Sequence, residues 1–174
     1  MCIPHCPSSE GHRGVYNSIT NIMKNITKKT LWVSVTLLTF IYSVYSKPIS
    51  YEDKVVAITI LAEARGEGKA GMYAVAAVIA QRAVERKQKP SQVCLAKWQF
   101  SCWNGKSVKQ LEKLLKCPQA TYALQLAKHI DKLDRSFVGH ANHYHATWMK
   151  KKPYWAKVYK PTKVIGQHIF YTSK

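Results

Sequence analysis

The sequence predicts a small, mainly helical α+β domain that contains a short β-hairpin. Apolar residues recur with helical periodicity over residues 51–64, 72–86 and 119–133, which favours three helices around one core. Residues 164–171 mix β-branched and aromatic side chains, a composition typical of a strand. We expect residues 143–145 to be the antiparallel partner of this strand.

The first predicted helix carries the stretch around which the domain is organised. Ser50 and Asp53 fit a capping box at its start. Gly66 and Gly68 follow its end, where glycine is favoured because it tolerates positive φ. Glu63 lies just before this break, beside a glycine-lined gap that a ligand could approach closely. The residues expected to face the core are Val55, Ile58 and Leu61.

Glu63 is the leading candidate for a catalytic residue. Apolar neighbours and the negative end of the helix dipole both disfavour an ionised carboxylate, so we expect the pKa of Glu63 to be raised. A glutamate with a raised pKa is suited to general acid catalysis. A second interpretation stays open at this point, in which Glu63 is a solvated surface residue or forms an ion pair with Arg65.

The middle of the chain predicts a buried helix and an aromatic wall. A glycine-rich connection over residues 66–71 precedes the helix of residues 72–86, which is apolar nearly all round at its start and is therefore expected to be buried. Residues 91–105 then form an irregular wall, with a turn at its end. The wall contains three aromatic residues, Trp98, Phe100 and Trp103. We expect two of them to lie in the core, although any of the three could instead stack on a sugar ring.

The second half adds a short basic helix over residues 108–116 and a cluster of histidines at residues 140–145. His143 and His145 would share one side of a strand, which is compatible with a metal site. Asp134 is the only acid nearby, so we favour hydrogen-bonded or surface histidines. We expect no metal and no cofactor.

Charge and cysteine content narrow the class of protein. The net charge of +18 over 174 residues indicates affinity for polyanions, such as nucleic acid, anionic lipid or an anionic bacterial envelope. Cys2 and Cys6 lack a second pair of ligands, so they support a zinc site only weakly. The remaining cysteines leave an odd count. In an exported domain Cys94–Cys102 or Cys102–Cys117 could form a disulfide, whereas in a cytosolic chain all would be thiols.

A secretory signal peptide is expected at residues 23–46. Basic residues at 24–29 precede an uncharged apolar stretch at 31–45, and the small residue Ser46 follows. The same segment could instead remain as a membrane anchor, but it is short for a full span of about 20 residues.

The signal peptide sets the expected domain boundaries. Translation is expected to start at Met23, so residues 1–22 would be a spurious extension. Residues 47–174 form the mature domain, which keeps 23 basic and eight acidic residues and thus a net charge of +15. We expect this domain to be exported to the periplasm or the cell envelope.

Three blocks of the mature domain resemble, in order, the SleB-type cell wall hydrolases. Residues 62–82 are similar to the E-A-R-G-E motif of that family and its following A-V-A-x-V-I-x-N-R helix, with Gln81 in place of the usual Asn. Residues 99–103 resemble its Q-F-S-x-W wall, and residues 142–171 resemble its closing segment. The resemblance covers about residues 52–172.

The resemblance implies a lysozyme-like or lytic-transglycosylase-like fold and peptidoglycan as the substrate. The bond cleaved would be the one between N-acetylmuramic acid and N-acetylglucosamine, and the catalytic acid of the family maps onto Glu63. A lytic transglycosylase requires only one carboxyl group, which favours this mechanism in a domain poor in acids. The alternative is a muramidase-type hydrolase that uses Glu63 as the acid and Glu67 as the second carboxylate.

Further residues could bind the substrate, and Tyr144 is favoured among them because a phenol can both stack on and hydrogen-bond a sugar. Arg65 and Glu67 could instead form a structural ion pair. The candidates for substrate binding are Arg65, Gln99, Ser101, Trp103, Asn142, Tyr144 and His145.

The expected partners follow from the implied substrate and from the charge. We expect binding to peptidoglycan glycan strands and to the anionic envelope surface, no binding to nucleic acid, and a monomer. A competing class is a cationic glycan- or membrane-binding exported protein without catalysis, and a third option is a family member that has lost its activity.

Overall fold

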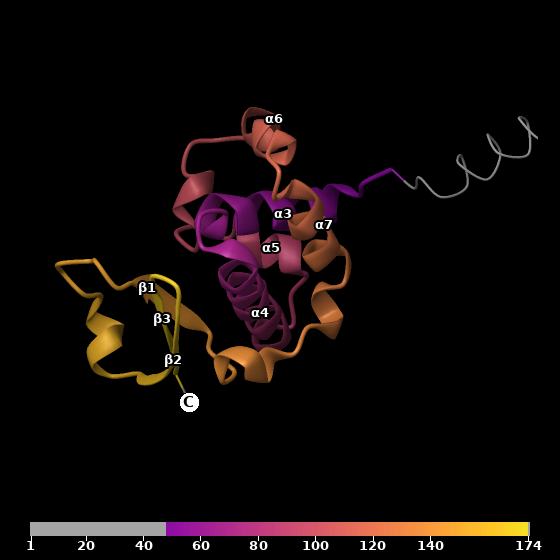
Figure 1. Cartoon of the computed structure of the whole chain (residues 1–174). Coiled ribbons are helices and arrows are strands. Elements are labelled where there is room, and N and C mark those ends of the chain that lie inside the picture. Colours follow the sequence, from indigo (N-terminus) through magenta and orange to yellow (C-terminus); the bar gives the residue numbers. More distant parts are fainter. Residues whose placement is uncertain (1–47, 174) are drawn as a thin grey trace, which may run out of the picture. The chain divides into compact units, whose positions relative to one another are not determined.

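The computed structural model of the chain describes residues 48–173 (Figure 1). The predicted N-terminal extension, the predicted signal peptide or anchor, and the cysteines Cys2 and Cys6 lie outside the described residues. Within residues 48–173, no helix has both the length and the apolar character that a membrane span requires.

The helix α3 lies at the centre of the helical part and packs against three other helices (Figure 1). Its residues from Val55 to Leu61 are all buried, so the helix is enclosed on every side rather than on one face. The predicted core residues Val55, Ile58 and Leu61 are fully buried, which confirms that expectation. The bounds are α3 Tyr51–Ala64, α4 Gly68–Arg86, α5 Pro90–Leu95 and α7 Ala120–Lys128.

The second helix begins earlier than the glycine pattern predicts. The backbone N–H of Glu67 donates to the carbonyl of Ala64 at 3.0 Å, and this turn closes α3 so tightly that α4 starts at Gly68. Gly71 therefore lies inside α4, where an added Cβ would collide with the side chain of Glu67. Close packing, rather than a break in the helix, explains this glycine.

Short helical segments connect the larger elements. The predicted basic helix of residues 108–116 is divided into α6 and η2, and the predicted helix of residues 119–133 is divided into α7 and η3. His129, with φ −117° and ψ 24°, interrupts the second of these. The bounds are η1 Ser101–Trp103, α6 Val108–Leu111, η2 Glu112–Lys116, η3 Ile130–Lys132, η4 Arg135–Val138 and η5 Tyr154–Lys157.

A three-stranded antiparallel sheet has the order β1-β3-β2, with β1 His143–Ala146, β2 Lys160–Ile165 and β3 His168–Thr172. The predicted antiparallel pairing is confirmed, because His143 lies opposite Tyr171 and His145 opposite Ile169. The predicted strand of residues 164–171 is wrong in its bounds: Val164 and Ile165 end β2, and β3 begins at His168 after a turn at Gly166, whose φ is +55°. The strand β2 was not predicted, since Pro161 and its mostly exposed side chains obscure the pattern. The register shifts between Pro161 and Lys163.

Two hydrophobic clusters share α4. The larger cluster joins α4 to α3, α5 and α7, and the smaller one joins α4 to η4 and the sheet. In the smaller cluster, Ala74, Ala77 and Val78 of α4 contact buried residues that include Val138 and Phe170. The sheet is thus anchored on the same helix that follows Glu63.

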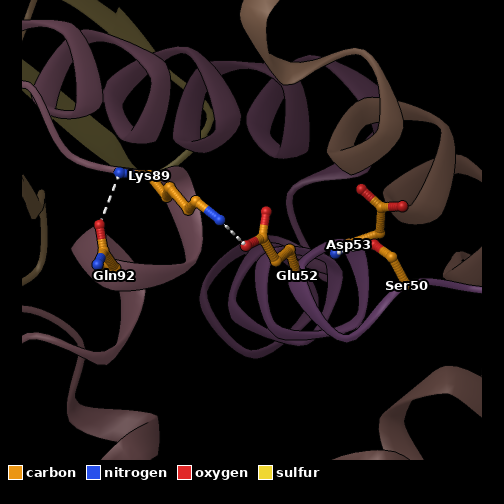
Figure 2. A network of polar contacts seen from close by, with 5 residues as sticks. All are labelled: Ser50, Glu52, Asp53, Lys89 and Gln92. Atoms are coloured by element: carbon orange, nitrogen blue, oxygen red, sulfur yellow. Dashed lines mark hydrogen bonds and ion pairs between the residues drawn. The ribbon is translucent and has the colours of Figure 1, made fainter.

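Polar contacts fix the start of α3 (Figure 2). Ser50 Oγ accepts the N–H of Asp53 at 3.0 Å, which is the cap that the sequence predicts. Lys89 Nζ donates to Glu52 Oε1 at 2.8 Å, and the N–H of Lys89 donates to Gln92 at 2.9 Å. These contacts tie the first turn of α3 to the first turn of α5.

Candidate active site

Glu63 lies in the last turn of α3 and is partly buried. Its Oε2 atom accepts a hydrogen bond from the hydroxyl of Tyr144 at 2.9 Å. The two residues are 81 positions apart in the chain, so the contact depends on the docking of β1 against the helices. The structure therefore brings together Glu63 and Tyr144, the candidate acid and the favoured candidate for substrate binding.

The environment of Glu63 favours the protonated carboxyl group. Burial raises the pKa of Glu63 above its usual value, while the hydrogen bond from Tyr144 and the charge of Arg82 lower it in part. The expected direction of the pKa shift is thus present, and desolvation is its largest cause. A raised pKa keeps the carboxyl group protonated to a higher pH, as a general acid requires.

Tyr144 acts as a hydrogen-bond donor towards Glu63. Burial and the adjacent charge of Glu63 raise its pKa well above the usual value, so the hydroxyl keeps its proton. The ring contacts those of His168 and Phe170 at centroid distances of 5.1 and 5.6 Å. These contacts fix the ring, and the hydroxyl holds one carboxylate oxygen of Glu63 in place.

Arg82 of α4 is a charged residue near this site that the sequence analysis did not select. It is only 7% exposed, its Nε donates to the carbonyl of Asn142 at 2.7 Å, and its guanidinium lies 5.3 Å from the ring centre of Phe100. Within residues 48–173, its buried Nη1 has no hydrogen-bond partner. Burial lowers the pKa of Arg82, but a guanidinium remains charged in proteins. The sequence signal that could have identified Arg82 is its position as the last residue of the stretch, residues 74–82, that resembles the A-V-A-x-V-I-x-N-R helix of the family.

Glu67 has a different environment from Glu63. Its Oε2 accepts the backbone N–H of Gln167 at 2.7 Å, in the turn between β2 and β3. Gly166 has φ +55°, and an added Cβ there would collide with the Glu67 carboxylate. Arg65 is exposed, and its Nη1 is directed to the carbonyl of Leu61 at 3.4 Å instead of to Glu67. Glu67 thus holds the β2–β3 turn against the start of α4.

The wall of residues 99–103 flanks α3 and α4. Trp103 donates its Nε1–H to Thr59 Oγ1 at 3.0 Å, and Thr59 lies one helical turn before Glu63. Gln99 accepts from Arg86 at 2.9 Å, and Ser101 is exposed. Of these three candidates, Trp103 has the most direct connection to the helix that carries Glu63.

Asn142 and His145 are buried and hold the strands together. The side-chain amide nitrogen of Asn142 donates to Glu85 at 2.9 Å and to Ser173 at 2.7 Å. The His145 ring contacts the Ala146 carbonyl at 2.9 Å and the Tyr171 hydroxyl at 3.1 Å. Their polar atoms bond to the sheet and its end and, for Asn142, also to Glu85 of α4, and the structure gives neither residue a hydrogen bond with Glu63.

The described thiols lie in or against the core, and His143, His145 and His168 lie in the sheet, whereas His129 and His140 are exposed. Cys94, Cys102 and Cys117 are free thiols in the structure. Burial raises the pKa of Cys94 and Cys102 to about 12, so both remain protonated. His143 packs against Trp155 at a centroid distance of 4.9 Å. No group of three His, Cys, Asp or Glu residues that could hold a metal ion occurs within the described part of the chain.

The fold and the site first define a class of protein, a helical α+β domain that holds a partly buried glutamate with a raised pKa. Residues 66–171 match the family model described as Cell Wall Hydrolase, which is more than half of the chain. The chain therefore belongs to the cell wall hydrolase family and is an enzyme of that family. The matched region begins three residues after Glu63.

Solved structures agree with this assignment. The catalytic domain of the germination-specific lytic transglycosylase SleB from Bacillus anthracis is similar at a TM-score of 0.56 and 26% identity, over 73% of this chain and 99% of that domain. The catalytic domain of Bacillus cereus SleB is similar at a TM-score of 0.54 and 25% identity, over 73% of this chain and 94% of that domain. No curated protein sequence matches the chain significantly. The expected lysozyme-like α+β fold and the resemblance to SleB-type hydrolases are confirmed.

Proposed function

We propose that this protein cleaves peptidoglycan glycan strands between N-acetylmuramic acid and N-acetylglucosamine, as a lytic transglycosylase with Glu63 as its single catalytic carboxyl group. One observation carries the proposal: the carboxyl group of Glu63 is desolvated, has a raised pKa and is held by Tyr144. The similarity to a lytic transglycosylase domain supports the reaction type.

The proposed reaction uses the two oxygens of Glu63 differently. Tyr144 donates to Oε2, which leaves Oε1 to carry the proton. Glu63 gives this proton to the glycosidic oxygen, and the bond between that oxygen and C1 of the muramic acid breaks. Glu63, now a carboxylate, takes the proton from the C6 hydroxyl, whose oxygen bonds to C1. The product is a 1,6-anhydro sugar, no water is consumed, and Glu63 ends protonated as it began.

Two neighbouring groups stabilise the carboxylate form of Glu63 in this scheme. Arg82 lies close enough for its positive charge to lower the pKa of Glu63, and the Tyr144 hydrogen bond acts in the same direction. Both groups stabilise the carboxylate that forms after the first proton transfer. Burial acts in the opposite direction and is the largest influence, so the pKa of Glu63 remains raised.

Glu67 bears on the choice between a transglycosylase and a hydrolase. A hydrolase requires a second group that activates water. The Glu67 carboxylate instead accepts the backbone N–H of Gln167. It also packs so closely on Gly166 that a side chain at position 166 would collide with it. This engagement favours the mechanism with one carboxyl group, and the muramidase-type hydrolase becomes the alternative outcome of the test.

The proposed location is outside the cytoplasm, at the cell envelope. The exposed lysines Lys150, Lys151 and Lys152 follow β1, and the excess of positive charge would hold the enzyme near anionic envelope polymers. This attraction depends on charge, so it should weaken as the ionic strength rises.

Digestion of purified peptidoglycan tests the proposal, with the full chain and its Glu63→Gln variant compared by the masses of the products. We expect anhydro-muropeptides from the wild-type chain only, each lighter by one water than the corresponding hydrolysis product. Reducing-end muropeptides would instead establish a hydrolase and direct attention to Glu67. Release of no fragments by the wild-type chain would contradict the proposal.

A further inference from the structure

A pocket of about 340 Å³ lies in the chain segment between α5 and α6. This volume is in the range of sites that bind small molecules. From here on, the name aromatic wall is kept for residues 96–106, which include most of the wall that the sequence predicts over residues 91–105. Six of the residues that line the pocket are Leu95, Lys97, Trp98, Phe100, Trp103 and Asn104.

The side chains of the pocket differ in how far they are buried. Phe100 is only 3% exposed and Trp103 is partly buried and hydrogen-bonded to Thr59, so both belong to the supporting structure. Trp98 is 75% exposed, although an indole is among the largest apolar groups that folding can bury. Core packing therefore does not account for Trp98.

The backbone at Trp98 is also unusual for its residue type. The N–H of Gln99 donates to the carbonyl of Ala96 at 3.1 Å, which closes a turn with Trp98 as its third residue. Trp98 has φ +64°, a conformation in this turn position that favours glycine. A tryptophan at this position is strained, and strained residues in ordered structures are often found at functional sites.

A second turn in the same wall provides an internal comparison. The N–H of Lys106 donates to the carbonyl of Trp103 at 3.2 Å, and the third residue of that turn is Gly105, with φ +67°. The two turns thus have nearly the same φ at the third position, and one of them has the residue that the geometry favours. The turn itself does not require an indole at Trp98, so a ligand is the more direct explanation.

The aromatic wall is connected to the surroundings of Glu63. Trp103 donates to Thr59, which lies about 6 Å before Glu63 along α3 at the usual helical rise. Burial raises the pKa of Cys102, and the charge of Glu63 raises it further, so this part of the wall is within electrostatic reach of the carboxyl group. A glycan strand that crosses Glu63 would therefore extend towards the pocket.

We propose that this pocket is a binding subsite for an N-acetylated hexosamine ring of the glycan strand, with the indole of Trp98 as its stacking surface. The apolar C–H face of a sugar ring matches an exposed indole. The Asn104 amide and the Lys97 ammonium, whose Nζ lies 5.4 Å from the centre of the Trp98 ring, supply polar contacts for the hydroxyl and acetamido groups. The inference rests on the proposed function, because it assigns a further sugar of the same substrate.

The test measures binding without cleavage. The full chain with Glu63→Gln is the parent, and its affinity for soluble oligomers of N-acetylglucosamine is measured by calorimetry. Trp98→Gly should raise the dissociation constant by about five- to tenfold, the amount expected for the loss of an aromatic stacking contact. Trp98→Tyr should keep most of the affinity. Trp148→Ala is the matched control, because Trp148 is 72% exposed but lies outside the aromatic wall, and it should leave binding unchanged.

A stability measurement separates binding from folding. Glycine suits the φ of Trp98, so Trp98→Gly should leave the melting temperature unchanged or raise it while binding weakens. The proposal is overturned if Trp98→Gly binds like the parent, if Trp148→Ala weakens binding equally, or if the parent does not bind the oligomers. Failure of the wild-type chain to cleave peptidoglycan would instead contradict the proposed function, and the binding result would still decide the subsite.

Discussion

The end of α3 and the start of α4 each present a glutamate, four residues apart in the chain, in opposite environments. Glu63 is desolvated, bonded to the hydroxyl of Tyr144 and near the charge of Arg82. Glu67 is partly exposed and accepts a backbone N–H from the β2–β3 turn. One short motif therefore supplies both a candidate acid and a structural contact, and the surroundings assign the two roles.

The largest expected effect separates the two glutamates by activity. Glu63→Gln keeps the shape of the side chain but cannot donate the proton, so the rate of peptidoglycan cleavage should fall by about 10²- to 10⁴-fold. Glu67→Gln keeps an acceptor for the N–H of Gln167 and should keep most of the activity. An equal loss in both variants, measured by release of soluble fragments, would break the comparison.

Tyr144→Phe should have the next largest effect. It removes a hydrogen bond that lowers the pKa of Glu63, so this pKa should rise further. The high-pH side of the rate profile, where the acid loses its proton, should then move to higher pH. The maximum rate should fall by about tenfold, because the bond orients the carboxyl group. An unshifted profile would show that the phenol does not act on Glu63.

Glu67→Ala should affect stability more than chemistry. It leaves the N–H of Gln167 without its charged acceptor, which should lower the free energy of unfolding by about 1–2 kcal/mol. Denaturant unfolding measures this difference, and Glu67→Gln is the matched control, expected to lose less. Equal stability of the alanine variant and the wild-type chain would show that the contact does not hold the β2–β3 turn.

The smallest effect is a pH-dependent change in stability at Glu63. A carboxyl group whose folded pKa is raised above its unfolded value destabilises the fold once it ionises, so stability is lost as the pH rises from the unfolded towards the folded pKa. Glu63→Gln should therefore raise the melting temperature slightly at pH 7 and leave it nearly unchanged at pH 4. A higher melting temperature at pH 4 alone would contradict the raised pKa.

Local sequence signals predicted those features that depend on neighbouring residues. The cap at Ser50, the helix of residues 51–64 and the place of Glu63 near its end all follow from spacing and from glycine positions. The pairing of β1 with β3 follows from composition. The resemblance to a known family then predicted the fold of the whole domain, over about residues 52–172.

Local sequence patterns could not predict the features that depend on contacts between distant segments of the chain. No spacing indicates that Arg82 lies near Glu63, or that Asn142 bonds to Glu85 and Ser173. The strand β2 was hidden because a proline and exposed lysines weaken a strand pattern. The contacts of Arg82 and Asn142 depend on how the folded chain buries them. Local spacing in the sequence does not contain this information.

The contact between Glu63 and Tyr144 has a consequence for the order in which the protein is made. Glu63 leaves the ribosome 81 residues before Tyr144, and β1 is held in its sheet by β3, which lies at the very end of the described chain. Glu63 thus acquires its hydroxyl partner only after β3 has been made. A nascent or truncated chain that lacks β3 would carry Glu63 without the hydroxyl that orients its carboxyl group, so under the proposed function such a chain should not cleave peptidoglycan.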